Sequence, residues 1–187
     1  MVAPDLIGAI LVHDRPEGLV AGRLVEVEAY DGPEDRASHA RAGRTARTAP
    51  MFGPPGHAYV FLVYGVHHCL NVVTGPRDEA RAVLLRAAVP LAGTALMRER
   101  RGRPHEPDWR LAAGPGRLGA AFAIDRRLDG ADLTDGPLRI LAAAIVPSPS
   151  GGGAVVAGPR VGVGYAGEPW TSVPWRFHLQ GDPSVSR

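Results

Sequence analysis

Three polar side chains stand at alternate positions of one short segment: Glu26, Glu28 and Tyr30. They belong to the run 19–30, in which the polar positions alternate with apolar ones in a way typical of a β-strand. Successive side chains of a strand point to opposite faces, so these three share one face. Two interpretations stay open. The face is the solvated side of an antiparallel sheet, or Glu28 takes a proton from a water molecule.

One arginine, Arg86, interrupts the apolar run 82–88. A guanidinium in an apolar strand must pair with an acid, reach solvent or line a cavity, because burial without a partner is costly. An ordinary structural salt bridge and a functional role both fit the sequence. If the partner is Glu28, the pair keeps that carboxylate ionised and helps to hold a water molecule.

The aromatic residues of the segment 30–64 are Tyr30, Phe52, Tyr59, Phe61 and Tyr64. We interpret Phe52 and Tyr59 as core residues. Tyr64 differs because it precedes a glycine at an expected hairpin tip, near the loop 41–57, which holds three arginines and no acid. A ring there suits insertion between bases: unstacking costs a few kcal/mol, and base–aromatic stacking returns about 1–3 kcal/mol per base.

The adjacent residues His67, His68 and Cys69 are of metal-ligating types. Neighbouring strand residues point to opposite faces, however, and no further ligand is spaced to join them. We therefore expect no metal site.

The glycine-rich segment 114–119 superficially resembles a dinucleotide-binding motif. It lacks a clear preceding strand, and its proline would stiffen the loop. We interpret it as the start of a short helix. Either it is a simple capping turn, or its N–H groups hold a phosphate with help from Arg117.

Composition removes several mechanisms. All 21 basic residues are arginines, against 19 acids, and the formal net charge is +2. Without lysine, the chain completes no Walker-type phosphate loop and has no side-chain amine for a Schiff base. The single cysteine excludes an intramolecular disulfide, and no stretch reaches the roughly 18 apolar residues of a membrane span. We expect a soluble cytoplasmic protein without a membrane partner.

Short strands and turns must position these groups, and 187 residues predict one domain. Strands are expected over 19–30, 58–63, 66–74 and 82–88, with an apolar segment at 6–12 and a hairpin tip at 64–65. Residues 31–35 predict a strand end, a helix cap and an acidic first turn. Helices are expected over 90–101, ended by Gly102, and from 114 to about 124. A flexible loop at 147–153 precedes expected closing strands at 155–156, 160–165 and 173–179.

Ordered motifs along the chain resemble the methylpurine (3-methyladenine) DNA glycosylases of the alkyladenine type. They are EVEAY at 26–30, GPED at 32–35, SH at 38–39, GRT at 43–45, MFGPPG at 51–56, YVFLVYG at 59–65, CLN at 69–71, LLRA at 84–87, GPGRL at 114–118 and RVGVG at 160–164. The resemblance covers nearly the whole chain. It implies an α+β fold, a single DNA glycosylase domain over 1–187 with a curved antiparallel β-sheet and flanking short helices.

The resemblance further implies a monofunctional glycosylase that flips an alkylated purine nucleotide from duplex DNA and hydrolyses its N-glycosidic bond, without metal or cofactor. Deaminated purines are less secure substrates, because a neutral base needs more help to leave. By motif position, Glu28 is the general base, and Arg86 and the Val161 carbonyl help to hold the attacking water. The base pocket is formed by Tyr30, His39, Phe61 and Asn71, of which Asn71 disfavours normal guanine.

For DNA binding, the resemblance implies that Tyr64 is the wedge that fills the gap left by the flipped nucleotide. The expected DNA backbone contacts are Arg44, Thr45, Arg47 and Arg117. Phe61 departs from the family, which commonly has tyrosine there; stacking is preserved, but a hydroxyl is lost. The expected partner is duplex DNA with a damaged purine, bound by a monomer that is associated with the nucleoid when on DNA.

Two other functions compete with this one. The arginine-rich loop also fits a non-catalytic damaged-DNA or nucleic-acid-binding module of the same fold. A nucleoside hydrolase acting on free nucleosides is a third hypothesis, against which the expected wedge and basic loop argue. The lack of lysine sharpens the first hypothesis: without a side-chain amine, activated water is the remaining route, and the product is an intact strand with an abasic site.

Overall fold

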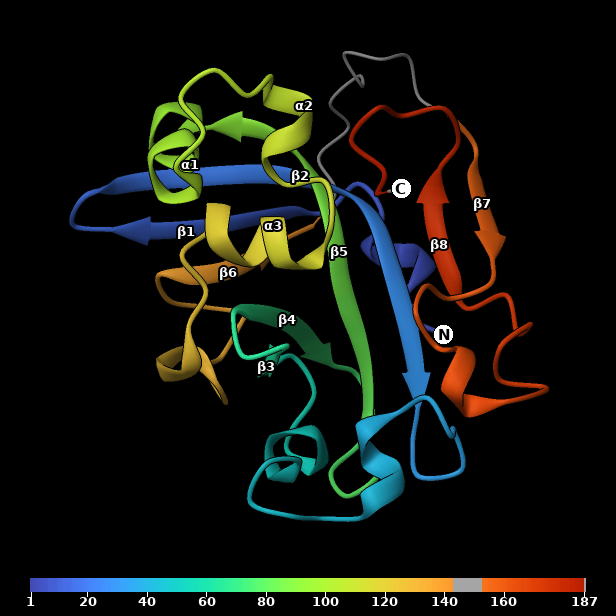
Figure 1. The fold of residues 1–187 in the computed structure, drawn as a ribbon. Helices are drawn as coiled ribbons and strands as arrows, with labels where there is room; N and C mark the ends of the chain where they lie inside the picture. Colours follow the sequence, from blue (N-terminus) through green and yellow to red (C-terminus); the bar gives the residue numbers. More distant parts are fainter. Residues whose placement is uncertain (143–152, 187) are drawn as a thin grey trace.

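The computed structural model describes residues 1–142 and 153–186 of the chain. Its central element is the long strand β2 (Gly18–Asp31). This strand pairs antiparallel with β1 (Ile10–Arg15), β5 (Arg81–Ala92) and β8 (Arg176–Leu179). Figure 1 shows β2 crossing the molecule from the helical region to the loops that follow it.

The partner of β2 changes along its length, and this change curls the sheet. The part up to Arg23 pairs with β1, whereas Glu26 to Glu28 pair with β8. The register against β5 shifts between Leu24 and Glu26 and again before Val27. Such bulges bend a strand and increase its twist. The two glutamates therefore lie at the bend, beside the C-terminal strand.

The remaining strands extend the sheet on both sides. The order is β3-β4-β5-β2-β1-β6, with β8 on β2 and β7 on β8. The added strands are β3 (Ala58–Val63), β4 (His67–Val73), β6 (Leu138–Leu141) and β7 (Val155–Gly158). All their ladders are antiparallel. The curved antiparallel sheet expected from the sequence is confirmed.

Short helices gather on one side of the sheet, as Figure 1 shows for α1 (Thr94–Arg101), α2 (Asp108–Leu111) and α3 (Pro115–Ala121). In α3 the lack of a side chain at Gly119 matters, because a Cβ there would collide with the backbone carbonyl of His68 in β4. Single 3-10 turns are η1 (Pro4–Leu6), η2 (His39–Ala42), η3 (Ala49–Phe52), η4 (Arg126–Leu128) and η5 (Gly164–Ala166). No described helix has the length and apolar character needed to cross a membrane.

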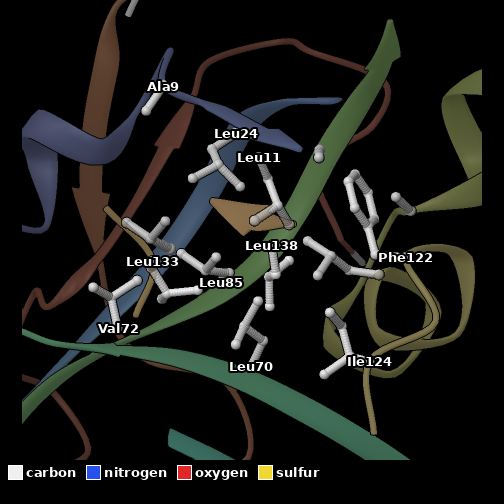
Figure 2. Packing of buried hydrophobic residues seen from close by; sticks show 14 of the residues in the cluster. Ala9, Leu11, Leu24, Leu70, Val72, Leu85, Phe122, Ile124, Leu133 and Leu138 are labelled. Carbon is white, nitrogen blue, oxygen red and sulfur yellow. The ribbon is translucent and has the colours of Figure 1, made fainter. Parts of the chain in front are cut away.

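The main core lies between the sheet and α3. Figure 2 shows leucines from the strands β1, β2, β4, β5 and β6 converging there, with Phe122 and Ile124 closing the cluster from the end of α3. The leucines are Leu11, Leu24, Leu70, Leu85 and Leu138, each 0–1% exposed. Burial of each of these side chains contributes about 1.5–3 kcal/mol to the stability of the folded state. This apolar layer holds β2, β4 and β5 rigidly, and the polar residues discussed below project from those strands.

Most strand predictions are confirmed, including the hairpin of β3 and β4 with its tip at residues 64–65. The expected helix over 90–101 is correct only from Thr94. Residues 90–92 continue β5, because they still pair with β2, and Gly93 then turns the chain with φ 75°. The predicted end at Gly102, in the left-handed conformation with φ 59°, is confirmed.

Two predictions are wrong. The segment 31–35 forms turns without a helix; Asp35 is drawn into the interior by an ion pair with Arg160. Residues 160–165 form a turn and then η5, because Gly162 takes φ 76°. The apolar segment 6–12, for which no element was predicted, enters strand β1 from Ile10. Sequence patterns also missed α2 and β6. Of the expected loop at 147–153, residues 147–152 lie outside the described part of the chain.

Candidate active site

Residues from β2, β3, β4, β5 and the segment 161–165 enclose a cavity of about 340 Å³. The sequence-predicted residues that line it are Tyr30, His39, Phe61, Tyr64, Asn71, Arg86 and Val161. These residues are spread over more than half of the chain, and the curled sheet brings them together. Further lining residues that the sequence did not single out are Met51, Cys69 and Tyr165.

Glu28 lies directly behind this lining and is fully buried. Its Oε1 accepts a hydrogen bond from the backbone N–H of Val161 at 2.7 Å. Its Oε2 accepts one from the Tyr30 hydroxyl at 3.0 Å and one from Arg86 Nη1 at 3.2 Å. A carboxylate offers about four acceptor positions. Three are filled within the described residues, so Oε1 retains a position for one further donor such as a water molecule.

Arg86 is ion-paired with Glu28, one of the possibilities that the sequence left open, and it has a second acidic partner. Its Nε donates to Glu26 Oε1 at 2.7 Å, and its Nη2 donates to the Ser186 hydroxyl at 3.0 Å. Burial alone would lower the pKa of Arg86, but the charges of Glu28 and Glu26 raise it above its usual value. Glu26 is also fully buried. The solvated-face interpretation of these glutamates is therefore wrong.

The Tyr30 side chain is a fixed donor at this site. Burial, followed by the charge of Glu28, raises the pKa of Tyr30 well above its usual value. The phenol thus stays protonated and donates to the carboxylate. The Arg160 guanidinium lies over the Tyr30 ring, 4.7 Å from the ring centroid. Such a cation–ring contact holds the ring in place.

Three aromatic rings form one wall of the cavity. His39 meets Phe61 edge-on with ring centroids 4.5 Å apart, and Tyr59 stacks on Phe61 at 5.6 Å. The Tyr59 hydroxyl lies 3.0 Å from His39 Nδ1. Tyr59 was predicted as core; it is 1% exposed but also reaches the cavity. Its position two residues before Phe61 on β3 was the signal that could have placed it there.

His39 is an uncharged part of that wall at neutral pH. Burial lowers its pKa to about 4, and the charges of Arg47 and Arg41 add to this shift. Arg47 Nη2 lies 3.5 Å from His39 Nε2. The wall is consequently aromatic and neutral, and the face of one of its rings can stack on a planar base.

Asn71 closes the end of the cavity from β4. It is 4% exposed, and its amide nitrogen donates to the Tyr59 carbonyl at 3.1 Å. This hydrogen bond fixes the amide and leaves its oxygen and a second N–H for a ligand.

Tyr64 stands at the hairpin tip and is 92% exposed. Its φ of 52° places it in the left-handed region, which non-glycine residues adopt at a cost of about 1–2 kcal/mol. Strain of this kind is concentrated at functional sites. The Tyr64 ring projects into solvent, and it also lines the rim of the cavity.

The four predicted DNA-backbone residues lie outside the cavity lining. Arg44 is ion-paired with Asp78, so the expectation that no acid balances the loop 41–57 is wrong. Thr45 belongs to a turn in which its N–H donates to the Thr48 hydroxyl at 2.8 Å. Arg117, far along the chain, lines a separate groove.

An ion pair missed by sequence reasoning holds Val161 in place. Arg160 and Asp35, whose side chains are both 0% exposed, form a bidentate pair, with Nη1 at 2.5 Å and Nη2 at 2.9 Å from the carboxylate oxygens. Arg160 also donates to the Ala29 carbonyl at 3.0 Å. Because Val161 follows directly, this anchor sets the N–H that bonds Glu28. A lone arginine in the apolar run 154–163 was the available signal.

Among the described residues, no three His, Cys, Asp or Glu side chains are grouped to hold a metal.

Comparison with known proteins gives a consistent result. The model of the family described as methylpurine-DNA glycosylase (MPG) matches residues 1–183. Several relatives carry the name "Putative 3-methyladenine DNA glycosylase". The one from Streptomyces avermitilis is 49% identical over 188 residues, covering 99% of this chain and 84% of the relative. Those from Anaeromyxobacter dehalogenans strain 2CP-1 and Methanocella arvoryzae are 52% and 45% identical, covering 100% of this chain and 80% and 90% of their own.

Proposed function

We propose that this chain, which belongs to the methylpurine-DNA glycosylase family, is a monofunctional DNA-3-methyladenine glycosylase of base-excision repair. Its substrate is duplex DNA with an alkylated purine. The observation that carries the mechanism is the environment of Glu28: a buried carboxylate bound by three cavity-lining groups, with one acceptor position left.

The reaction begins when the damaged nucleotide leaves the helix and its base enters the aromatic cavity. Extrusion costs a few kcal/mol, least for a damaged or mismatched base, and stacking returns about 1–3 kcal/mol. The base stacks along Phe61 and His39, while the amide of Asn71 contacts the purine edge and disfavours guanine. His39 is uncharged, which suits this role, because an alkylated purine is cationic and a protonated histidine would repel it.

Glu28 then activates the nucleophile. A water molecule donates one proton to the open position on Oε1 while Arg86 and the Val161 carbonyl hold it. Its oxygen attacks C1′ of the deoxyribose as the bond from C1′ to the purine nitrogen breaks. The electron pair of that bond leaves with the base and neutralises the positive charge that alkylation gave it. One base therefore suffices, and general-base catalysis of this kind contributes about 10²–10⁴-fold.

DNA is held outside the cavity. Tyr64, exposed at the hairpin tip, fills the gap left by the extruded nucleotide. Arg44, Thr45, Arg47 and Arg117 contact phosphates, and Arg44 exchanges Asp78 for a phosphate on binding. We further propose that residues 1–187 form one glycosylase domain, which acts as a monomer in the cytoplasm and on the nucleoid.

The product is an abasic site in an intact strand. Strand cleavage by a glycosylase requires an amine that forms a Schiff base with the sugar, and no lysine is present. Covalent trapping with borohydride should therefore give no adduct. A trapped complex would point to the terminal amine and contradict a purely hydrolytic reaction.

Base release from a panel of lesion duplexes tests the proposal. Each otherwise identical duplex carries one alkylated or deaminated purine, and strand breaks are counted after heating in alkali. Breaks that appear only after the alkali step, strongest for alkylated purines, are the expected result. Binding of lesion DNA without base release from any tested duplex would instead favour a non-catalytic module of the same fold.

A further inference from the structure

A second concavity, larger than the active-site cavity, opens beside it. This groove of about 840 Å³ lies between the three helices α1, α2 and α3 and residues 183–186 near the C-terminus. The side chains of six arginines line it: Arg86, Arg100, Arg101, Arg103, Arg110 and Arg117. We call it the arginine groove.

The charge of the arginine groove is only partly neutralised by protein. None of its described lining residues is acidic. Glu106, at one end, pairs with Arg101 at 2.8 Å and reaches Arg110 only at 3.9 Å. The guanidinium groups of Arg103 and Arg117 have no hydrogen bond or ion pair within the described residues.

The arginines are close enough to repel one another. Burial lowers the pKa of Arg101; Glu106 opposes this shift, and the charges of Arg117, Arg103 and Arg110 add to it. Like charges gathered in a concave surface destabilise the free protein and are relieved when an anion binds between them. The groove is thus built for a ligand with several negative charges.

The position of the groove identifies that ligand. Arg86 and Pro115 line both the arginine groove and the active-site cavity, so the two share a wall. A strand whose nucleotide is extruded into the cavity must continue past this wall. The groove also presents Trp109, 40% exposed, beside Arg110. Arginines with an accessible aromatic ring match a sugar–phosphate backbone.

We propose that the arginine groove binds the phosphodiester backbone of the lesion strand next to the extruded nucleotide, with Arg103, Arg110 and Arg117 as the phosphate contacts. This inference rests on the proposed function. It extends the DNA contact surface from the hairpin, the loop 41–57 and Arg117 to Arg103 and Arg110 on the helical side of the molecule.

Salt dependence of DNA binding measures these contacts directly. Each neutralised phosphate adds about 0.9 to the slope of log affinity against log salt concentration. In the double variant Arg103→Ala with Arg110→Ala, the slope should therefore fall by about 1.8, and affinity at about 0.1 M salt should drop roughly 60-fold relative to the difference at about 1 M salt. Both residues are exposed, so the fold should tolerate the change. The loss should not depend on the base sequence that flanks the lesion, because phosphate contacts do not read sequence.

Two further variants make the test specific. Arg81→Ala with Arg139→Ala removes the same charge outside the groove, from β5 and β6, and should keep the wild-type slope. Arg103→Lys with Arg110→Lys retains the charge and should restore most of the slope. An unchanged slope in the alanine double variant, or an equal fall in the control, would overturn the arginine groove as a DNA surface.

The outcome is separable from that of the proposed function. If wild-type protein releases base but the alanine double variant keeps its salt slope, the groove inference alone fails. If wild-type protein releases no base from any lesion duplex, the proposed function fails whatever the slopes are.

Discussion

Two glutamates on one face of β2 have nearly the same surroundings and different capacities for chemistry. Glu26 and Glu28 are both 0% exposed and both bound by Arg86. Glu26 accepts hydrogen bonds from Arg86 Nε at 2.7 Å, Arg176 Nε at 2.7 Å, Ser186 N–H at 2.6 Å and the Ser186 hydroxyl at 2.8 Å. Three of these hydrogen bonds reach Oε1 and one, from the Ser186 N–H, reaches Oε2; of the three donor residues, only Arg86 lines the active-site cavity.

Glu28 has three such partners among the described residues, and each of them lines the cavity. The comparison indicates that burial and an arginine partner do not by themselves make a carboxylate a base. We propose that an open acceptor position facing the cavity does so for Glu28. Glu26 instead fastens Arg86 to the C-terminal segment, which keeps the guanidinium in position against Glu28.

The largest effect on stability at neutral pH should come from Glu26, whose hydrogen bonds go to two arginines and to Ser186. Burial raises the pKa of Glu26, but Arg86 and Ser186 outweigh it and hold that pKa below its usual value of 4.5. Glu26→Gln removes the charge that two arginines share, and hydrogen bonds to charged groups are worth about 1.5–3 kcal/mol. Urea unfolding at neutral pH should show a loss of that size. A loss below about 0.5 kcal/mol would show that the network is dispensable.

A smaller effect, confined to DNA binding, is expected at the rim of the cavity. Tyr64→Ala removes a ring that is 92% exposed, so the free energy of unfolding should change by less than about 0.5 kcal/mol. Retention of lesion duplex should weaken by about 1–3 kcal/mol, the value of one base stack. Binding assays with damaged and undamaged duplex provide the measurement. Undiminished lesion binding would contradict the role of Tyr64 as a wedge.

A further effect, visible only in the pH dependence of stability, concerns His39 in the cavity wall. Folding lowers the pKa of His39 from 6.5 to about 4, so the unfolded chain binds more protons between these values. The contribution of His39 to stability is complete above pH 6.5 and is lost as pH falls towards 4. His39→Gln should therefore flatten the decline in unfolding free energy over this range. Parallel curves for variant and wild type in urea unfolding would contradict the shifted pKa.

Sequence patterns predicted the site correctly where the deciding contact lies within one element or one hairpin. Alternation placed Glu26, Glu28 and Tyr30 on one face, and the isolated charge in 82–88 marked Arg86 as needing a partner. The hairpin and its exposed tyrosine were similarly readable from a glycine between two apolar runs. Motif resemblance supplied the roles of single residues, and the fold then brought seven of them around one cavity.

The remainder depends on contacts between distant parts of the chain. Ser186 and Arg176 reach Glu26 across 160 and 150 positions, and Arg160 reaches Asp35 across 125. No local pattern encodes such pairs. They decide that Glu26 is bound to the C-terminal segment, that 31–35 forms no helix and that Val161 faces Glu28. The arginine groove likewise exists only after three short helices and the C-terminal segment come together.

The central claim is that Glu28, and not Glu26, accepts the proton of the attacking water. Its most direct test is the single-turnover rate of base release by Glu28→Gln and Glu26→Gln, each measured on saturating lesion duplex at a temperature where both remain folded. We predict that Glu28→Gln binds the duplex but loses about 10²–10⁴-fold in rate, whereas Glu26→Gln loses far less. Equal losses in the two variants, or an unchanged rate for Glu28→Gln, would contradict the assignment of Glu28 as the base.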